Sequence, residues 1–228
     1  MNRAVVTLLI VMAAQALGQT PPPVKQNDRF VRLNYAELTP KQKELAELYQ
    51  SNARTLLGGS GPYDIDSQLM AAAESASIYV GIRSPEFTAA IMKAGSFLRG
   101  GAVPRKLHEI AILLTARAWN AQYEWWSHHQ HAKAAGLSED IIQAIAVGKR
   151  PAKMQPDEEA VYNFCTELRD TRQVSDKTFE AVKTQLGSEK AVVELMGAMA
   201  VYDLIAMYTN VDRFPVPHGI DPELKPLQ

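Results

Sequence analysis

The residues most suited to chemistry lie between positions 107 and 136, in the segment LHEIAILLTARAWNAQYEWWSHHQHAKAAG, which holds four histidines, two glutamates and three tryptophans. If its second half is a helix, Glu124, His128 and His131 project from one face. A carboxylate beside an imidazole raises the pKa of the histidine and fixes its tautomer, so the group can exchange protons near neutral pH. On spacing alone, an ordinary solvent-exposed Glu124–His128 pair, worth a few tenths of a kcal/mol, is slightly favoured over such a site.

Glu109 is a second carboxylate, and it can reach this face only if the chain turns. On one straight helix, Glu109 and His128 would lie roughly 30 Å apart along the axis. A break near Trp119 and Asn120, with Asn120 capping a new helix, would let two helices pack side by side and bring Glu109 toward the second. The letters WNAQ permit such a break without requiring it.

Metal binding is an alternative use of Glu124, His128 and His131, since all three are ligand types. The HExxH pattern is absent, however, and a fourth ligand would have to come from elsewhere, so no metal site is predicted. His129 points roughly 100° away from His128 and is expected at the surface or against a tryptophan, and His108 is expected to be peripheral. The nearby aromatic residues are most simply core or interface side chains, although one of them can wall a pocket.

Helix start and stop signals recur along the rest of the chain, and no window shows the period-two alternation of strands. Thr39 and Pro40 open one helix and Gly58 follows its end, and Ser138 caps another. The predicted helices cover 39–58, 66–82, 84–100, 103–119, 120–136, 138–149, 155–170, 175–187 and 188–211. We therefore predict an all-α protein of about eight or nine helices.

The first residues, MNRAVVTLLIVMAAQALGQT, have the pattern of a secretory signal peptide. Arg3 precedes an uncharged apolar run from Ala4 to Ala14, which at about eleven residues is too short to span a bilayer. We predict a signal peptide at 1–18 with export to the periplasm or beyond, an extended proline-rich tether at 19–37, and a single helical domain at 38–228. The alternative is an uncleaved anchor or a buried helix, and no other segment resembles a membrane span.

Charge and cysteine content narrow the binding partners and the chemistry that the sequence allows. Lys+Arg 24 against Asp+Glu 25 gives a net charge of -1, so no surplus of positive charge exists to bind nucleic acid. Cys165 is the one cysteine of this sequence, which rules out an intramolecular disulfide. It lies in register with Val161 and Leu168, and a thiol on an apolar helical face is more often a core residue than a nucleophile.

The stretch RKLHEIAILLTARAWNAQYEWWSHHQHAKAAGLSEDIIQAIAVGK resembles the carboxymuconolactone decarboxylase family, which shares the alkyl hydroperoxidase D-like fold. The shared pattern is a glutamate in one helix, a sharp break, an E-x-x-x-H helix and then AGLS, and it covers about residues 67–150. The tail YDLIAMYTNVDRFPVPHG also looks like the end of members that lack thiols. The resemblance implies a helical bundle that acts on a small molecule and forms homo-oligomers, commonly trimers or hexamers.

The peroxidase branch of this family has a relay glutamate twelve positions before a C-x-x-C pair and a histidine four positions after it. On this sequence the cysteine positions fall on Ala121 and Glu124, whereas Glu109 and His128 match the relay residues. Because the thiolate is the nucleophile in peroxide reduction, the chain is not expected to be a disulfide-cycling peroxidase. The decarboxylase branch, which needs no cofactor, matches better.

That resemblance implies His128 as the proton donor or acceptor, with Glu124 orienting it and Glu109 completing a relay. The substrate-binding candidates are Arg105, Arg117, Tyr123 and His131. We therefore favour a cofactor-independent lyase acting on a small lactone or keto acid. A non-catalytic oligomeric protein that binds small molecules is the main alternative, and peroxidase-related or metal-dependent activity is a weaker one.

Overall fold

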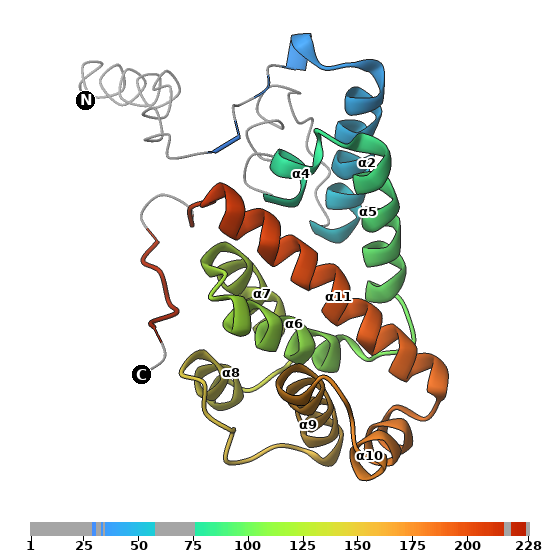
Figure 1. Cartoon of the computed structure of the whole chain (residues 1–228), viewed down its shortest axis with the longest axis vertical. Coiled ribbons are helices and arrows are strands. Elements are labelled where there is room, and N and C mark those ends of the chain that lie inside the picture. The colour runs from blue at the N-terminus through green and yellow to red at the C-terminus, as the bar shows by residue number, and fades with distance from the viewer. Residues whose placement is uncertain (1–28, 31–32, 34, 58–75, 217–219, 227–228) are drawn as a thin grey trace, which may run out of the picture.

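The computed structural model describes residues 29–30, 33, 35–57, 76–216 and 220–226, and within them every regular element is a helix (Figure 1). The predicted all-α class is therefore confirmed. The predicted signal peptide at 1–18 lies outside the described residues, as do most of the predicted tether at 19–37 and the first part of the helix predicted at 66–82.

Apart from η1, which lies within the predicted tether, the described helices correspond to predicted ones. They are η1 (Tyr35–Glu37), α2 (Pro40–Leu57), α4 (Ala76–Gly81), α5 (Pro85–Arg99), α6 (Arg105–Trp119), α7 (Gln122–Ala134), α8 (Glu139–Ala146), α9 (Pro156–Thr171), α10 (Asp176–Leu186) and α11 (Glu189–Asp212). Ser138, Ser175 and Ser188 cap α8, α10 and α11, because each hydroxyl accepts the backbone N–H three residues further on. Local side-chain chemistry thus fixes three of the helix starts.

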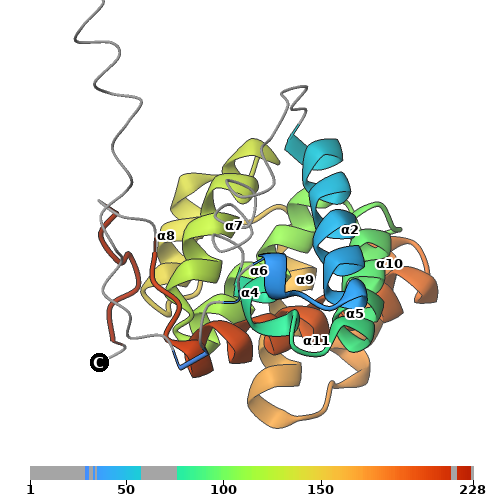
Figure 2. The same ribbon diagram turned by 90° about the horizontal axis from the view of Figure 1, so that it is seen from above.

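Helix α6 forms the centre of the fold, where it packs against α7, α8, α9 and α11 (Figures 1 and 2). Every residue from Leu107 to Arg117 is buried, so neighbouring elements cover this helix on all sides. The main core fills the space between these helices, and Trp125 and Phe164 are among its large members. Polar side chains on α6 are consequently removed from water, which strengthens their electrostatic interactions.

The predicted break between α6 and α7 is confirmed, but Asn120 has a different role from the one expected. It adopts a left-handed conformation (φ 51°, ψ 37°) and forms the C-cap of α6, not the N-cap of α7. Ala121 occupies the N-cap position of α7 without a side-chain cap. Asparagine tolerates the left-handed conformation better than most residues. The chain turns at Asn120 and Ala121, and α6 and α7 pack together.

The segment 220–226 crosses the junction of α6 and α7. Leu224 is buried against the main core, and its backbone makes two hydrogen bonds with the side-chain amide of Gln122. Glu223 accepts a hydrogen bond of 3.0 Å from the indole N–H of Trp125. These contacts attach the C-terminal segment to the first turn of α7.

Helix α11 contributes both to the core and to the surface. It packs against α4, α5, α6, α7 and α10. Among the described residues it is the one helix that is long and apolar enough to cross a membrane by length and composition. Apolar side chains also remain exposed along it, at Val193, Met196, Met207 and Val211. One side of α11 thus completes the core while the other carries an exposed apolar stripe.

Candidate active site

Glu109 and His128 meet in the interior between α6 and α7. The side chain of Glu109 is fully buried, and its Oε2 lies 2.8 Å from Nδ1 of His128. Its Oε1 lies 2.7 Å from Nη2 of Arg105, one turn earlier on α6. The turn at Asn120 therefore brings together two residues that are far apart in sequence, and Arg105 is paired with the same carboxylate.

The carboxylate of Glu109 is held in its ionised form. Burial opposes ionisation, but His128, the hydrogen bond to its ring and Arg105 outweigh that effect, so the pKa of Glu109 lies below its ordinary value of 4.5. An ionised carboxylate only accepts hydrogen bonds, so Nδ1 of His128 carries a proton and Nε2 is the basic nitrogen of the neutral ring. The His128 side chain is 12% exposed, so solvent can reach the ring.

Helices α5 and α11 add side chains that the sequence prediction did not include. The ring of Tyr202, from α11, lies edge-on to His128 and to His108, with centroids 4.7 Å and 6.0 Å away. Arg99, the last residue of α5, lies close enough for its charge to act on the Tyr202 phenol. Burial raises the pKa of Tyr202 to about 12, so the phenol stays protonated. His131 also joins the group, with its ring centroid 5.4 Å from that of His128.

His108 is a buried member of this group, not a peripheral residue as the sequence suggested. Its side chain is almost fully buried, and neither ring nitrogen has a hydrogen-bond partner within the described part of the chain. Burial lowers its pKa from 6.5 to about 4; attraction to Glu109 opposes this shift, while Arg105, His128 and Arg99 reinforce it. The ring is therefore uncharged at neutral pH.

Glu124 is buried and makes no hydrogen bond or ion pair with His128. Neither of its carboxyl oxygens has a hydrogen-bond partner among the described residues. Burial, assisted by the charge of Asp203, raises the pKa of Glu124 well above 4.5 and favours the uncharged acid. The expected Glu124–His128 pair is therefore absent, in both its exposed and its catalytic form, and Glu109 from the neighbouring helix pairs with Nδ1 of His128 instead.

Arg117 lies outside this group and supports the fold. Its guanidinium donates to the backbone carbonyls of Ala146 (3.0 Å) and Lys225 (2.9 Å) and to Oδ1 of Asn120 (3.0 Å). These bonds join the end of α6 to the end of α8 and to the C-terminal segment. The structure therefore gives Arg117 structural partners in place of the predicted substrate carboxylate.

Tyr123 packs into an aromatic cluster. Its ring centroid lies 5.7 Å from that of Trp126 and 4.7 Å from that of Phe214. The edge-on contact with Phe214 joins α7 to the segment that follows α11. The structure thus places Tyr123 as a packing residue between these elements.

His129 is engaged with carboxylates on the other side of α7. It is packed against Trp125, as one of the two expectations had it, and its nitrogens lie 2.6 Å from Glu223 and 3.1 Å from Glu139. Over the residues that the structure describes, no group of three or more His, Cys, Asp or Glu side chains is arranged to hold a metal ion.

Cys165 occupies the core position that the sequence predicted. Its side chain is fully buried, and burial raises the pKa of the thiol to about 12.

We expect Ellman's reagent to leave the native protein unmodified at neutral pH and to titrate the Cys165 thiol after denaturation, because a buried, protonated thiol does not react. Cys165→Ala is the reagent blank, and rapid modification of the native wild-type protein would contradict this prediction.

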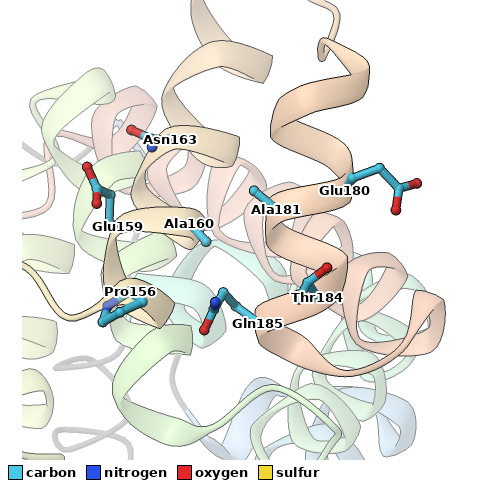
Figure 3. A pocket seen from close by; sticks show the side chains of 8 residues that line it. All are labelled: Pro156, Glu159, Ala160, Asn163, Glu180, Ala181, Thr184 and Gln185. Atoms are coloured by element: carbon cyan, nitrogen blue, oxygen red, sulfur yellow. The ribbon is translucent and has the colours of Figure 1, made fainter.

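A separate groove lies between α9 and α10 (Figure 3). It has a volume of about 410 Å³ and is lined by Pro156, Glu159, Ala160, Asn163, Glu180, Ala181, Thr184 and Gln185. This lining contains no histidine, arginine or cysteine and shares no residue with the group around His128. The groove is therefore separate from the candidate site, whose residues lie on α5, α6, α7 and α11.

Two solved structures resemble this arrangement of helices. A peroxidase-related protein from Ralstonia eutropha JMP134, described as an alkylhydroperoxidase AhpD core, matches with a TM-score of 0.63 at 15% identity, over 84% of this chain and 93% of that one. A protein of unknown function from Agrobacterium tumefaciens, linked in its description to the antioxidant defence protein AhpD, matches with a TM-score of 0.54 at 16% identity, over 60% and 94%. No family model matches the chain, and no curated protein sequence does. The predicted AhpD-like fold is thereby confirmed.

Proposed function

We propose that this AhpD-like chain is a cofactor-independent lyase that removes a carboxylate from a small lactone or keto acid by acid–base chemistry at His128. The observation that carries the proposal is the buried pair of Glu109 and His128, with 2.8 Å between Oε2 and Nδ1. Such a pair fixes the histidine tautomer and stabilises the imidazolium that proton transfer requires. A dithiol mechanism has no support here, because the one thiol of this sequence is buried in the core.

The proposed reaction begins with His128 protonated beside the ionised Glu109. The bond between the departing carboxylate and its carbon breaks, its electron pair remains on the substrate as an enolate, and carbon dioxide leaves. His128 then delivers its Nε2 proton to that carbon and regains a proton from water. Glu109 stabilises the imidazolium, and Arg105 helps to keep Glu109 ionised.

Tyr202 and Glu124 complete the proposed site as uncharged groups. Burial raises the pKa of both side chains above their ordinary values, which favours the protonated form of each. They lie close enough for a charge on Glu124 to influence the Tyr202 phenol. Two neutral O–H donors can stabilise an enolate without adding a negative charge beside it, which supports a catalytic role for Glu124 different from orienting His128.

We also propose that the mature chain is exported and assembles as a homo-oligomer, either a trimer or a hexamer. The N-terminal signal pattern supports export. The exposed apolar stripe of Val193, Met196, Met207 and Val211 on α11 supports assembly, because a second copy would remove this surface from water.

The test of the lyase proposal is a turnover assay on a panel of lactone acids and β-keto acids, run in D₂O with EDTA. We expect release of carbon dioxide and incorporation of one deuterium at the carbon that lost it, because the His128 proton exchanges with solvent. Mass spectrometry of the product measures both. If no acid decarboxylates faster than in buffer alone, the lyase proposal is wrong, and binding without turnover would support the non-catalytic alternative.

A further inference from the structure

Arg99 brings a positive charge to the site, and no acidic side chain neutralises it within the described residues. The side chain is partly buried at the end of α5, and its Nη2 lies 3.1 Å from the Ser96 hydroxyl. Its Nε is buried and has no hydrogen-bond partner in the described part of the chain. A buried guanidinium N–H without an acceptor destabilises the protein. A ligand that supplies an acceptor at this position would therefore bind favourably.

Arg105 differs from Arg99 in this respect. Its guanidinium lies 2.7 Å from Oε1 of Glu109, so its charge is largely balanced inside the protein. If a substrate carboxylate took that guanidinium, Glu109 would lose the partner that helps to keep it ionised. Of the two arginines beside the histidines, Arg99 is therefore the better anchor for an anion.

The surroundings of Arg99 also favour a negative ligand. It lies close enough for its charge to act on the Tyr202 phenol and on the rings of His108 and His131. The fixed charges of the group are then two guanidinium groups against the one carboxylate of Glu109. A carboxylate bound at Arg99 would balance this excess and accept a second hydrogen bond from the phenol.

We propose that Arg99 and the hydroxyl of Tyr202 form the anchor for a carboxylate of the substrate, with Nε and an Nη of the guanidinium as a bidentate donor. This inference rests on the proposed function, because it concerns the same site. The anchored carboxylate is the one that stays on the substrate. A guanidinium bound to the departing carboxylate would stabilise the ground state and slow the loss of carbon dioxide.

The test uses a matched pair of probes, γ-butyrolactone-γ-carboxylate and its methyl ester, with binding measured by isothermal titration calorimetry. We expect the wild-type protein to bind the acid and to bind the uncharged ester far more weakly. Arg99→Gln should weaken binding of the acid by about 10- to 100-fold, the factor expected when a charge-assisted hydrogen bond is lost. Tyr202→Phe should weaken it by about 5-fold, because a neutral donor is lost.

Lys93→Gln is the matched control, since it removes a positive charge from an exposed position on the same helix. It should leave binding of the acid unchanged. Arg99→Lys keeps the charge but not the bidentate geometry and should give an intermediate affinity. Thermal melts check folding, and Tyr202→Phe provides an independent test if Arg99→Gln is unstable.

The anchor proposal is overturned if Arg99→Gln binds the acid as tightly as the wild type does, if the ester binds as well as the acid, or if the wild type binds neither. Turnover separates this outcome from failure of the lyase proposal. Decarboxylation that is unaffected by Arg99→Gln would remove the anchor but keep the lyase. Binding that depends on Arg99, without turnover of any acid, would keep the anchor and remove the lyase.

Discussion

Replacement of Glu109 by glutamine is expected to lower kcat of the proposed decarboxylation by about 1,000-fold while the protein stays folded. In the wild-type protein, the ionised carboxylate accepts the proton on Nδ1 of His128 and stabilises the imidazolium. A glutamine amide at the same place can donate its own N–H to Nδ1, which leaves the proton of the neutral ring on Nε2. The variant would then hold the wrong tautomer and lose the charge that stabilises the protonated ring.

The measurement is steady-state kinetics of the variant together with His128→Ala and the double variant. Because the two residues act as one unit, the double variant should be only slightly slower than either single variant. Glu124→Gln is the informative comparison, because it replaces an uncharged buried acid with a neutral amide that still donates hydrogen bonds. A Glu109→Gln enzyme with wild-type kcat would show that the pair has no part in proton transfer.

The fold could be predicted from the sequence because its signals are local. Helix starts at Ser138, Ser175 and Ser188 follow from a hydroxyl that reaches a backbone N–H three residues away. The position of the turn at Asn120 was predicted correctly, but the role of Asn120 was not. An asparagine can cap the start of a helix or, in the left-handed conformation, its end. Tertiary packing decides between these two outcomes.

The site was predicted only in part because its members come from four helices. Spacing on one helix shows that Glu124 and His128 share a face, but not which residue of the next helix lies opposite. The structure places Glu109 there, and Glu124 is left buried and unpaired by any described residue. Arg99 and Tyr202 join the site through packing of α5 and α11 on α6, which no local pattern specifies. The tyrosine at position 202 in the apolar run of α11 was an available signal, because a buried tyrosine usually has a polar partner.

His108 should make the protein lose about 3 kcal/mol of its free energy of unfolding as the pH falls from about 6.5 to about 4. Its folded pKa of about 4 lies below the ordinary 6.5, so above pH 6.5 the ring is neutral in both states and contributes no pH dependence. Between these two values, the unfolded chain binds a proton that the folded protein does not, and stability falls with pH. Below about pH 4 both states are protonated and the loss stops.

The variants His108→Leu and His108→Gln isolate this effect, with urea unfolding curves measured between about pH 4 and about pH 7. Comparison with wild type is essential because Glu124 acts in the opposite direction: its raised pKa makes it destabilise the fold as the pH rises above about 4.5. That contribution is present in all three proteins and cancels in the difference.

The free energy of unfolding relative to wild type should therefore rise for both variants as the pH falls, by about 3 kcal/mol at the acid end. Leucine replaces the titrating ring with an apolar side chain, whereas glutamine replaces it with a polar group that does not titrate, so agreement between the two slopes would assign the effect to titration. Curves that stay parallel to wild type would mean that the folded protein protonates His108 as readily as the unfolded chain does.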